Sequence, residues 1–168
     1  ISKTEFNKFK DNFTIQIGFT IFILKEVEEG FIILSPDYSK NPLTNITEDL
    51  TTALCIQLEQ VTFLKKLNLV GETISFQDKV ICAKGVLEVD NIYLERSGEC
   101  EKGDSGWYIG PVDESKENEE LEAYYAYEII RKRPSITKVL ALPSKYMAVF
   151  NKDRLEAVLD ENDIDILL

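Results

Sequence analysis

The sequence predicts an α+β protein, in which helices pack on mostly antiparallel sheet. Two kinds of periodicity favour this class. Apolar side chains alternate with small or polar ones from Phe13 to Ile21, as in a half-buried strand. Leucines then recur at helical spacing from Leu50 to Leu67, and the short apolar runs after Gly71 are joined by turns too short for crossover helices. With 168 residues and 44% hydrophobic content, the chain can form one compact domain or two small modules.

Residues 1–70 are expected to form a hairpin-plus-helix module whose role the sequence leaves open, and residues 71–168 a second α+β domain. Period-2 alternation and turn residues indicate the strands, and apolar stripes indicate the helices. The tail from Asp160 is interpreted as an edge strand or a frayed end. The predicted strands are 13–21, 31–34, 73–76, 79–83, 86–89, 91–95, 106–109 and 145–150, and the predicted helices are 4–10, 47–67, 118–133, 135–142 and 153–159.

The helix predicted at 47–67 has the clearest pattern in the first module. Asn45 and Glu48 before it resemble a capping box. An apolar stripe at helical spacing follows and is expected to face the core. A zipper with a partner helix is the alternative interpretation of this stripe. The stripe consists of Leu50, Leu54, Leu58 and Val61, extended by Leu64 and Leu67.

The acidic composition favours a protein partner over nucleic acid or a membrane. Asp and Glu number 30 against 19 Lys and Arg, a net charge of −11. Such a surface repels phosphates and anionic membranes, whereas it attracts a basic partner and speeds its association. The alternative is that the charge only keeps the protein soluble. The most apolar run, 13–24, is shorter than the roughly 20 residues that span a membrane.

Most catalytic constellations are missing, so we expect a protein that is not an enzyme and needs no cofactor or metal. Histidine is absent, which removes the usual general base and the commonest zinc ligand. Ser105 lies in a Gly-Asp-Ser-Gly sequence like that of trypsin-like proteases, but no histidine can activate it. Adjacent carboxylates such as Asp113 and Glu114 leave a carboxylate- or metal-dependent hydrolase as an alternative, although a solvated acidic face is the favoured interpretation.

The cysteines indicate a reducing compartment. Cys55 and Cys82 are expected to be buried thiols. Together with Cys100 they make an odd number, which argues against a disulfide scaffold. We therefore expect a cytoplasmic protein. Because the sequence begins at Ile1 rather than Met, a removed signal peptide and a periplasmic location are the alternative.

Aromatic and acidic residues gather between Asp104 and Glu122 and supply most of the candidate contacts. Trp107 is expected to be core, with a contact role as the alternative. Three tyrosines at 124, 125 and 127 cannot all face one side of a helix, so at least one is expected to be exposed near acidic residues, as in protein interfaces. The candidate partner-binding residues are Trp107, Tyr108, Asp113, Glu114, Glu117, Glu120 and Tyr124.

Two runs in this region form a recognisable signature: Asp104-Ser105-Gly106-Trp107-Tyr108-Ile109, followed by Asp113-Glu114, and the later run Arg133-Pro134-Ser135-Ile136. They resemble a bacterial immunity-protein family, the one numbered thirty-three among polymorphic-toxin immunity families. The resemblance covers residues 79–153. Two positions depart from the family pattern: Tyr108 stands where a basic residue is common, and Val112 where a glycine is usual. Membership implies a protein that binds a cognate secreted toxin and so protects its producer and sister cells.

Three functions therefore compete. The first is an immunity protein that occludes a toxin, which needs aromatic anchors and complementary charge rather than catalytic residues. The second is the carboxylate or metal hydrolase. The third is a non-catalytic regulatory module in which residues 1–70 form a dimerisation unit, and the sequence leaves the oligomeric state open.

Overall fold

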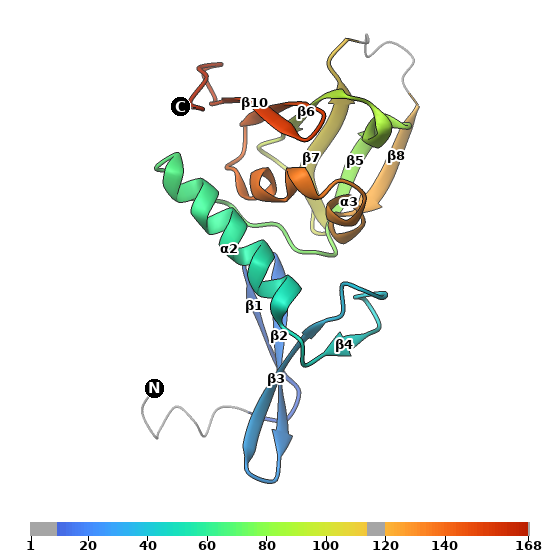
Figure 1. Cartoon of the computed structure of the whole chain (residues 1–168), viewed down its shortest axis with the longest axis vertical. Coiled ribbons are helices and arrows are strands. Elements are labelled where there is room, and N and C mark those ends of the chain that lie inside the picture. The colour runs from blue at the N-terminus through green and yellow to red at the C-terminus, as the bar shows by residue number, and fades with distance from the viewer. Residues whose placement is uncertain (1–9, 114–119, 168) are drawn as a thin grey trace. The chain divides into compact units, whose positions relative to one another are not determined.

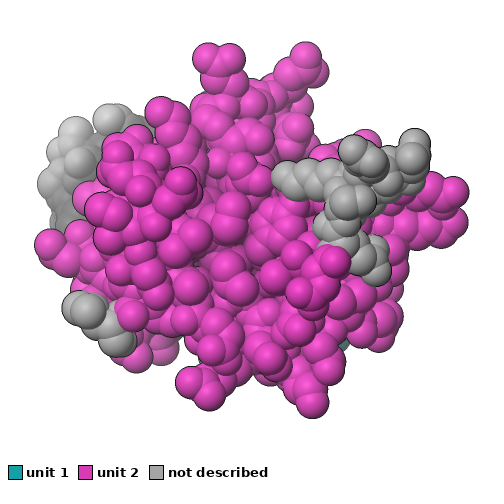
Figure 2. All heavy atoms as spheres, turned by 90° about the horizontal axis from the view of Figure 1, so that it is seen from above, with its two compact units in different colours: residues 1–57 teal, residues 58–168 magenta. Residues whose placement is uncertain are grey.

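The computed structural model describes residues 10–113 and 120–167. They separate into two compact units, residues 1–57 and 58–168, which Figure 2 colours differently. The fold is α+β, as the sequence predicts, with mostly antiparallel sheet in each unit. The proposed division into 1–70 and 71–168 stays a prediction. The helix predicted at 4–10 lies, apart from Lys10, outside the described residues.

The first unit contains an antiparallel sheet in the order β1-β2-β3-β4. Its strands are β1 (Phe13–Ile17), β2 (Thr20–Val27), β3 (Gly30–Pro36) and β4 (Ile46–Thr47). The prediction of one strand over 13–21 is wrong, because the chain turns at Gly18, where φ is +60°. A glycine in the first position of a two-residue hairpin turn is typical of this reversal. The return strand predicted at 31–34 is confirmed within β3.

A small core and an exposed apolar face characterise the first sheet. Phe19 is buried, and its ring centroid lies 6.4 Å from that of Tyr38. The Tyr38 hydroxyl donates to Thr20 Oγ1 at 2.7 Å, and burial raises the pKa of Tyr38 to about 12. On β1 and β3, Phe13 and Ile33 face the same side through their shared neighbour Leu24, and they are 40% and 47% exposed.

Helix α2 (Thr51–Lys66) begins later than predicted because Thr47 pairs with β3 as part of β4 instead. Asp49 accepts the Thr51 N–H at 2.9 Å, so the predicted Asn45–Glu48 capping box does not start the helix. The predicted core stripe is wrong at two positions, since Leu54 is 52% and Leu58 67% exposed. Leu64 of the predicted stripe is buried, as predicted, and a neighbouring set at helical spacing is buried with it: Ala53, Ile56, Gln60 and Phe63. Cys55, expected to be buried, is exposed.

The second unit is built on a six-stranded sheet in the order β10-β9-β6-β7-β5-β8. Only β5 and β7 pair in parallel. Figure 1 shows the helical segments α3 (Ala126–Lys132) and η2 (Pro134–Ala141) on one face of this sheet. Its strands are β5 (Lys79–Ala83), β6 (Asn91–Arg96), β7 (Asp104–Pro111), β8 (Leu121–Tyr125), β9 (Met147–Asn151) and β10 (Arg154–Leu159).

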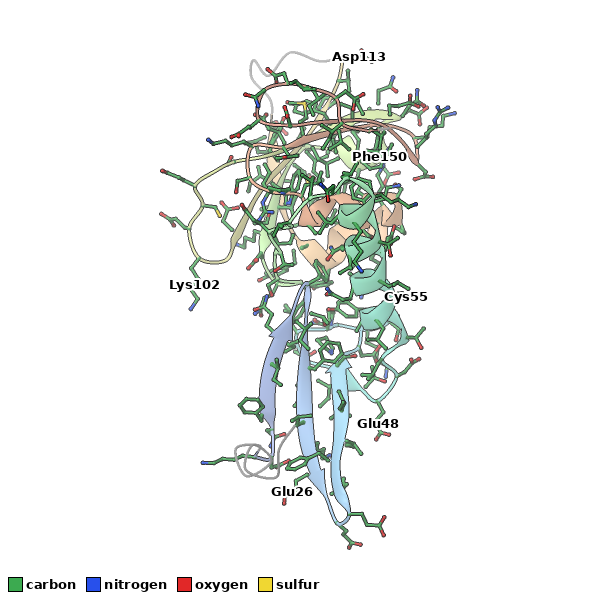
Figure 3. All side chains as sticks on the ribbon, turned by 90° about the vertical axis from the view of Figure 1, so that its left-hand side faces the viewer. Glu26, Glu48, Cys55, Lys102, Asp113 and Phe150 are labelled. Carbon is green, nitrogen blue, oxygen red and sulfur yellow. The ribbon has the colours of Figure 1, made fainter. Side chains whose placement is uncertain are left out.

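Side chains that point toward the helices form the core of the second unit. Successive strand residues point to opposite faces, so alternate positions of β6 and β7 are buried. Phe150, which Figure 3 labels inside the ribbon, is 0% exposed. The core members on the central strands are Ile92, Leu94, Trp107, Ile109, Ala148 and Phe150, and those on the helices are Ile129, Ile136, Val139 and Leu140.

The predictions for the second unit are confirmed for the strands at 79–83, 91–95, 106–109 and 145–150 and for the helical turn at 135–142. The prediction of a helix over 118–133 is wrong from Leu121 to Tyr125, because these residues form β8 and pair antiparallel with β5. Helix α3 begins only at Ala126. Residues 118 and 119 lie outside the described residues. Hydrogen bonds to a distant strand outweigh the local helical period here.

Three other local predictions are wrong. The residues at 73–76 form no strand, although Ile74 and Phe76 are buried. The predicted strand at 86–89 is the 3₁₀ helix η1 (Val86–Glu88), which follows Gly85 in the left-handed conformation. The predicted helix at 153–159 is strand β10, since a tight turn with Lys152 at φ +53° pairs this segment with β9. Beyond β10, the tail forms one bridge between Leu159 and Asp165 rather than a strand.

Candidate partner-binding site

Trp107 lies in the core of the second unit. Its side chain is 1% exposed, and its indole Nε1–H donates to the Leu140 carbonyl at 3.2 Å. The Arg96 guanidinium lies 5.8 Å from the ring centroid, within cation–π distance. The structure confirms the prediction that Trp107 is core, and this burial leaves it no surface for a direct contact.

Ser105 and Gly106 shape the backbone that carries Trp107. The Ser105 hydroxyl donates to the Lys79 carbonyl at 2.6 Å and accepts the Trp107 N–H at 3.1 Å. Gly106 has φ +74°, and its N–H donates to Asp104 Oδ1 at 2.8 Å. A side chain is strained in this left-handed region, which favours glycine there. The Asp-Ser-Gly-Trp run therefore joins β7 to β5 and to η2, and it serves the fold.

Two buried arginines bind main-chain carbonyl groups. Arg96 Nη1 donates to the carbonyls of Glu72, at 2.6 Å, and Leu142. Arg133, directly before Pro134, donates to the carbonyls of Val89, at 2.7 Å, and of Asp90 and Lys152. Burial lowers the pKa of both guanidinium groups from their ordinary value. The arginine of the Arg-Pro-Ser-Ile run thus ties two turns to α3.

The remaining candidates fall on different sides of the second sheet. Tyr108 pairs with Ile81 on the face away from the helices, and its ring lies 5.8 Å from that of Tyr93. Tyr124 pairs with Val80 and points to the opposite face. Because successive strand residues alternate, these two tyrosines cannot contact one partner surface together. Glu114 and Glu117 lie outside the described residues.

Asp113 and Glu120 lie at the same end of the sheet. β7 runs parallel to β5 and β8 runs antiparallel to it, so β5 and β7 end where β8 begins. Lys84 follows β5 at this end and forms an ion pair with Glu120, with Nζ 2.6 Å from Oε2. Figure 3 shows Asp113 here and Lys102 at the other end of β7. Both carboxylates are exposed.

A small pocket of about 70 Å³ opens beside this end of the sheet. The Tyr124 hydroxyl donates to Glu122 Oε2 at 2.6 Å, a hydrogen bond that raises the pKa of Tyr124. The Lys132 ammonium, from the last turn of α3, lies 5.5 Å from the centroid of the Tyr124 ring. The pocket is lined by Ala83, Gly85, Val86, Leu87, Glu88, Glu122, Tyr124 and Lys132.

The polar residues of this region form one surface, called the β8 surface below. It consists of Lys84, Glu88, Asp113, Glu120, Glu122, Tyr124 and Lys132. Four carboxylates against two ammonium groups give it a net charge of −2. Sequence reasoning found three of its members, Asp113, Glu120 and Tyr124, and missed Lys84, Glu88, Glu122 and Lys132. The alternation of Glu122 and Tyr124 was the available signal, but it was hidden by the prediction of a helix at 118–133.

The described residues offer little else with the character of a site. Among them, no group of three or more cysteine, aspartate or glutamate side chains is placed to hold a metal ion. Within the same residues, no helix combines the length and apolar character needed to cross a membrane. Cys82 is buried in β5, as predicted, and burial raises the pKa of its thiol to about 12.

Comparison with known proteins places the second unit in a family. The model of the Imm33-like domain matches residues 59–161, which include every strand of the six-stranded sheet. The chain belongs to the Imm33-like family. The resemblance seen in residues 79–153 is thereby confirmed and extended in both directions. Residues 1–58 lie outside the match. No curated protein and no solved structure matches the chain significantly.

Proposed function

We propose that the protein is an immunity protein that binds a cognate bacterial toxin through the β8 surface and neutralises it by occlusion. The observation that carries the proposal is the position of this surface. The carboxylates of Glu88 and Glu122 line a pocket together with Tyr124. The exposed carboxylates of Asp113 and Glu120 lie at the adjoining end of the Imm33-like sheet. Binding of this kind needs charge and shape complementarity but no catalytic group.

Charge on the β8 surface supports a basic partner. The surface carries a net charge of −2, and the whole chain carries −11. Long-range attraction of this sign speeds encounter with a positive surface and weakens at high salt. If the toxin is a nuclease, Asp113 and Glu120 would lie against the basic groove that binds phosphate. Occlusion of that groove would exclude the nucleic acid.

Apolar area beside the carboxylates supports a stable complex. Leu121 is 58% exposed and Val112 47% exposed, and both flank the end of the sheet where Asp113 and Glu120 lie. Interfaces combine such apolar contacts with a polar rim. The protein would act wherever its toxin acts, which we propose to be the cytoplasm, or the periplasm if a signal peptide has been removed. It would protect the producing cell and its sisters.

The proposal is tested by co-expressing the chain with tagged toxin candidates encoded beside its gene. The complex is expected to co-purify, and the chain is expected to rescue growth of cells that produce the toxin. The double variant Glu120→Lys/Glu122→Lys is expected to lose both effects. The matched control Glu28→Lys/Glu29→Lys, in the exposed turn before β3, is expected to keep them. If the β8 variant rescues growth as well as the wild type does, the β8 surface is not the binding site.

A second candidate function rests on the apolar face of the first sheet. Phe13, Ile17 and Ile33 are 40%, 48% and 47% exposed on β1 and β3. Exposed apolar side chains gathered on one sheet face are typical of contact surfaces. A regulatory module that dimerises through this face would explain them. Light scattering coupled to size-exclusion chromatography distinguishes the two candidates, since a concentration-independent monomer contradicts the dimer.

A further inference from the structure

The pocket on the β8 surface is large enough to hold the end of one side chain. Its volume of about 70 Å³ is far below the ~300–1,000 Å³ of pockets that bind drug-sized ligands. A drug-sized ligand is therefore too large for it. The pocket is nevertheless closed on several sides, by β8, by the last turn of α3 and by the turn into η1. It therefore fits a single group that projects from a partner.

The residues that line the pocket favour a positively charged group at the end of an aliphatic side chain. Ala83 and Val86 are buried and give the pocket an apolar floor. Such a floor suits the methylene stem of arginine or lysine, whose charged end stays among polar groups. Those groups are the carboxylates of Glu88 and Glu122. A neutral or acidic side chain would leave both carboxylates without an added counter-charge.

The Tyr124 ring already accepts a cation from the chain itself. The Lys132 ammonium lies 5.5 Å from the ring centroid, within the range of a cation–π contact. The Tyr124 hydroxyl binds one oxygen of Glu122 and so holds ring and carboxylate together. A carboxylate accepts about four hydrogen bonds, so an incoming donor has further positions on Glu122. With one ammonium and two carboxylates, the pocket keeps a net negative charge.

We propose that this pocket is a socket for one arginine side chain of the protein partner. The planar guanidinium would stack on the Tyr124 ring and donate two parallel hydrogen bonds to Glu122, a geometry that lysine lacks. Glu88 would supply the second negative charge. Lys132 would move aside as the guanidinium enters. This inference rests on the proposed function, because it assigns a role to the partner that function requires.

The test uses a probe that does not depend on the toxin. The isotope-labelled full chain is titrated with N-acetyl-L-arginine amide and followed by amide NMR shifts. The matched control is N-acetyl-L-citrulline amide, which keeps the shape of the side chain and lacks its charge. Arginine amide is expected to shift the resonances of 83–88, of Glu122, of Tyr124 and of Lys132, and citrulline amide is not. Shifts from both compounds, or from neither, would overturn the socket.

Variants separate a charge effect from a structural one. Glu122→Gln and Glu88→Gln are each expected to weaken arginine amide binding at least about tenfold, since each removes a charged acceptor. Lys132→Met is expected to strengthen it by a few-fold, since it removes the resident cation. The exposed Glu99→Gln serves as the control and is expected to leave binding unchanged. Equal effects of all four variants would overturn the socket.

Different experimental outcomes would contradict the arginine socket and the proposed immunity function. If the toxin complex forms and is unaffected by Glu122→Gln and Glu88→Gln, the socket is wrong and the immunity function stands. If no neighbouring gene product binds while arginine amide binds as expected, the immunity function is wrong and the cation socket stands. Binding to arginine amide that persists unchanged in Glu122→Gln would contradict the socket whatever the partner.

Discussion

The segment from Asp104 to Tyr125 has two halves that differ in how far their side chains are buried. In the first half, every second side chain of β7 from Ser105 to Ile109 points into the core, and Ser105 and Trp107 are each 1% exposed. In the second half, Asp113 and Glu120 are exposed at the end of the sheet where β8 begins. The first half carries the family resemblance, and the second half carries the candidate contacts.

The residues that carry the family resemblance are thus buried, whereas the residues that we propose as partner contacts are exposed. The Asp-Ser-Gly-Trp run and Arg133 satisfy buried backbone groups and fill the core. Any protein with this sheet needs such contacts, whatever its partner. The family match therefore reflects this buried framework, whereas the partner contacts that we propose lie on the exposed residues of the β8 surface. If this separation is correct, changes in the two halves will affect different measurements.

The largest effect is expected from Trp107→Ala. Removing a fully buried indole leaves a cavity and costs about 3–5 kcal/mol of unfolding free energy. Urea denaturation followed by circular dichroism measures the loss. A loss below about 1 kcal/mol would show that Trp107 is not part of the core. Any folded fraction of this variant is expected to bind the partner with unchanged affinity, because Trp107 lies in the core and not on the β8 surface.

Arg133→Met is expected to cost about 2–3 kcal/mol. The side chain donates to three carbonyls, and each buried group left unsatisfied costs on the order of 1–3 kcal/mol, partly offset by relief from burying a charge. The control Arg154→Met removes an 82% exposed side chain and is expected to cost at most about 0.5 kcal/mol. Equal losses in both variants, again by urea denaturation, would contradict the role of Arg133.

Cys82 gives a pH-dependent test of the strand that supports β8. Its thiol has a folded pKa of about 12 against an ordinary value of 9.0, so folding is favoured by the protonated form. This contribution is complete below pH 9 and is lost as the pH rises toward 12, by at most about 1.4 kcal/mol per pH unit. Tyr38 acts in the same direction above pH 10. Unfolding free energy is therefore expected to fall above pH 9.

The same burial predicts selective alkylation. At pH 8, iodoacetamide is expected to modify the exposed Cys55 and Cys100 and to leave Cys82 unmodified until the chain is unfolded. Peptide mass spectrometry identifies the modified positions. Rapid modification of Cys82 in the folded protein would mean that the sheet beneath the β8 surface opens readily.

The smallest effect on stability is expected from Lys84→Ala. The Lys84–Glu120 pair is well exposed, with 62% and 73% of the two side chains accessible, and such pairs contribute less than about 1 kcal/mol. The change makes the β8 surface more negative, so association with a basic partner is expected to become faster and more salt-dependent. Stopped-flow association at two salt concentrations checks this. A slower association would contradict a basic partner.

Sequence reasoning succeeded where a pattern had one physical interpretation. The segments 79–83 and 91–95 are short apolar runs between turn residues, and both are strands. At 118–133, Leu121, Tyr125 and Ile129 fit a helical period, yet pairing with β5 makes the first part a strand. In α2, two apolar stripes interleave, and periodicity alone cannot decide which one is buried. Leu54 and Leu58 belong to the exposed one.

The candidate site was only partly predictable for a similar reason. Asp113, Glu120 and Tyr124 stand close together in the sequence, so composition alone draws attention to them. Glu88 comes from a segment far from these residues in the chain, and Lys132 comes from the last turn of α3; both reach the pocket only through the sheet order and the placement of α3. Trp107 was included among the contacts because tryptophan is common in interfaces, but it fills the core.

Hydrogen exchange of the full chain with and without its co-purified toxin tests the central claim most directly. The account predicts slower exchange on binding at 84–88 and 120–125, with no change at 105–109, where backbone amides are already buried in the sheet. Protection confined to the first sheet or to β9 and β10, with none at β8, would contradict the claim that the toxin binds the β8 surface.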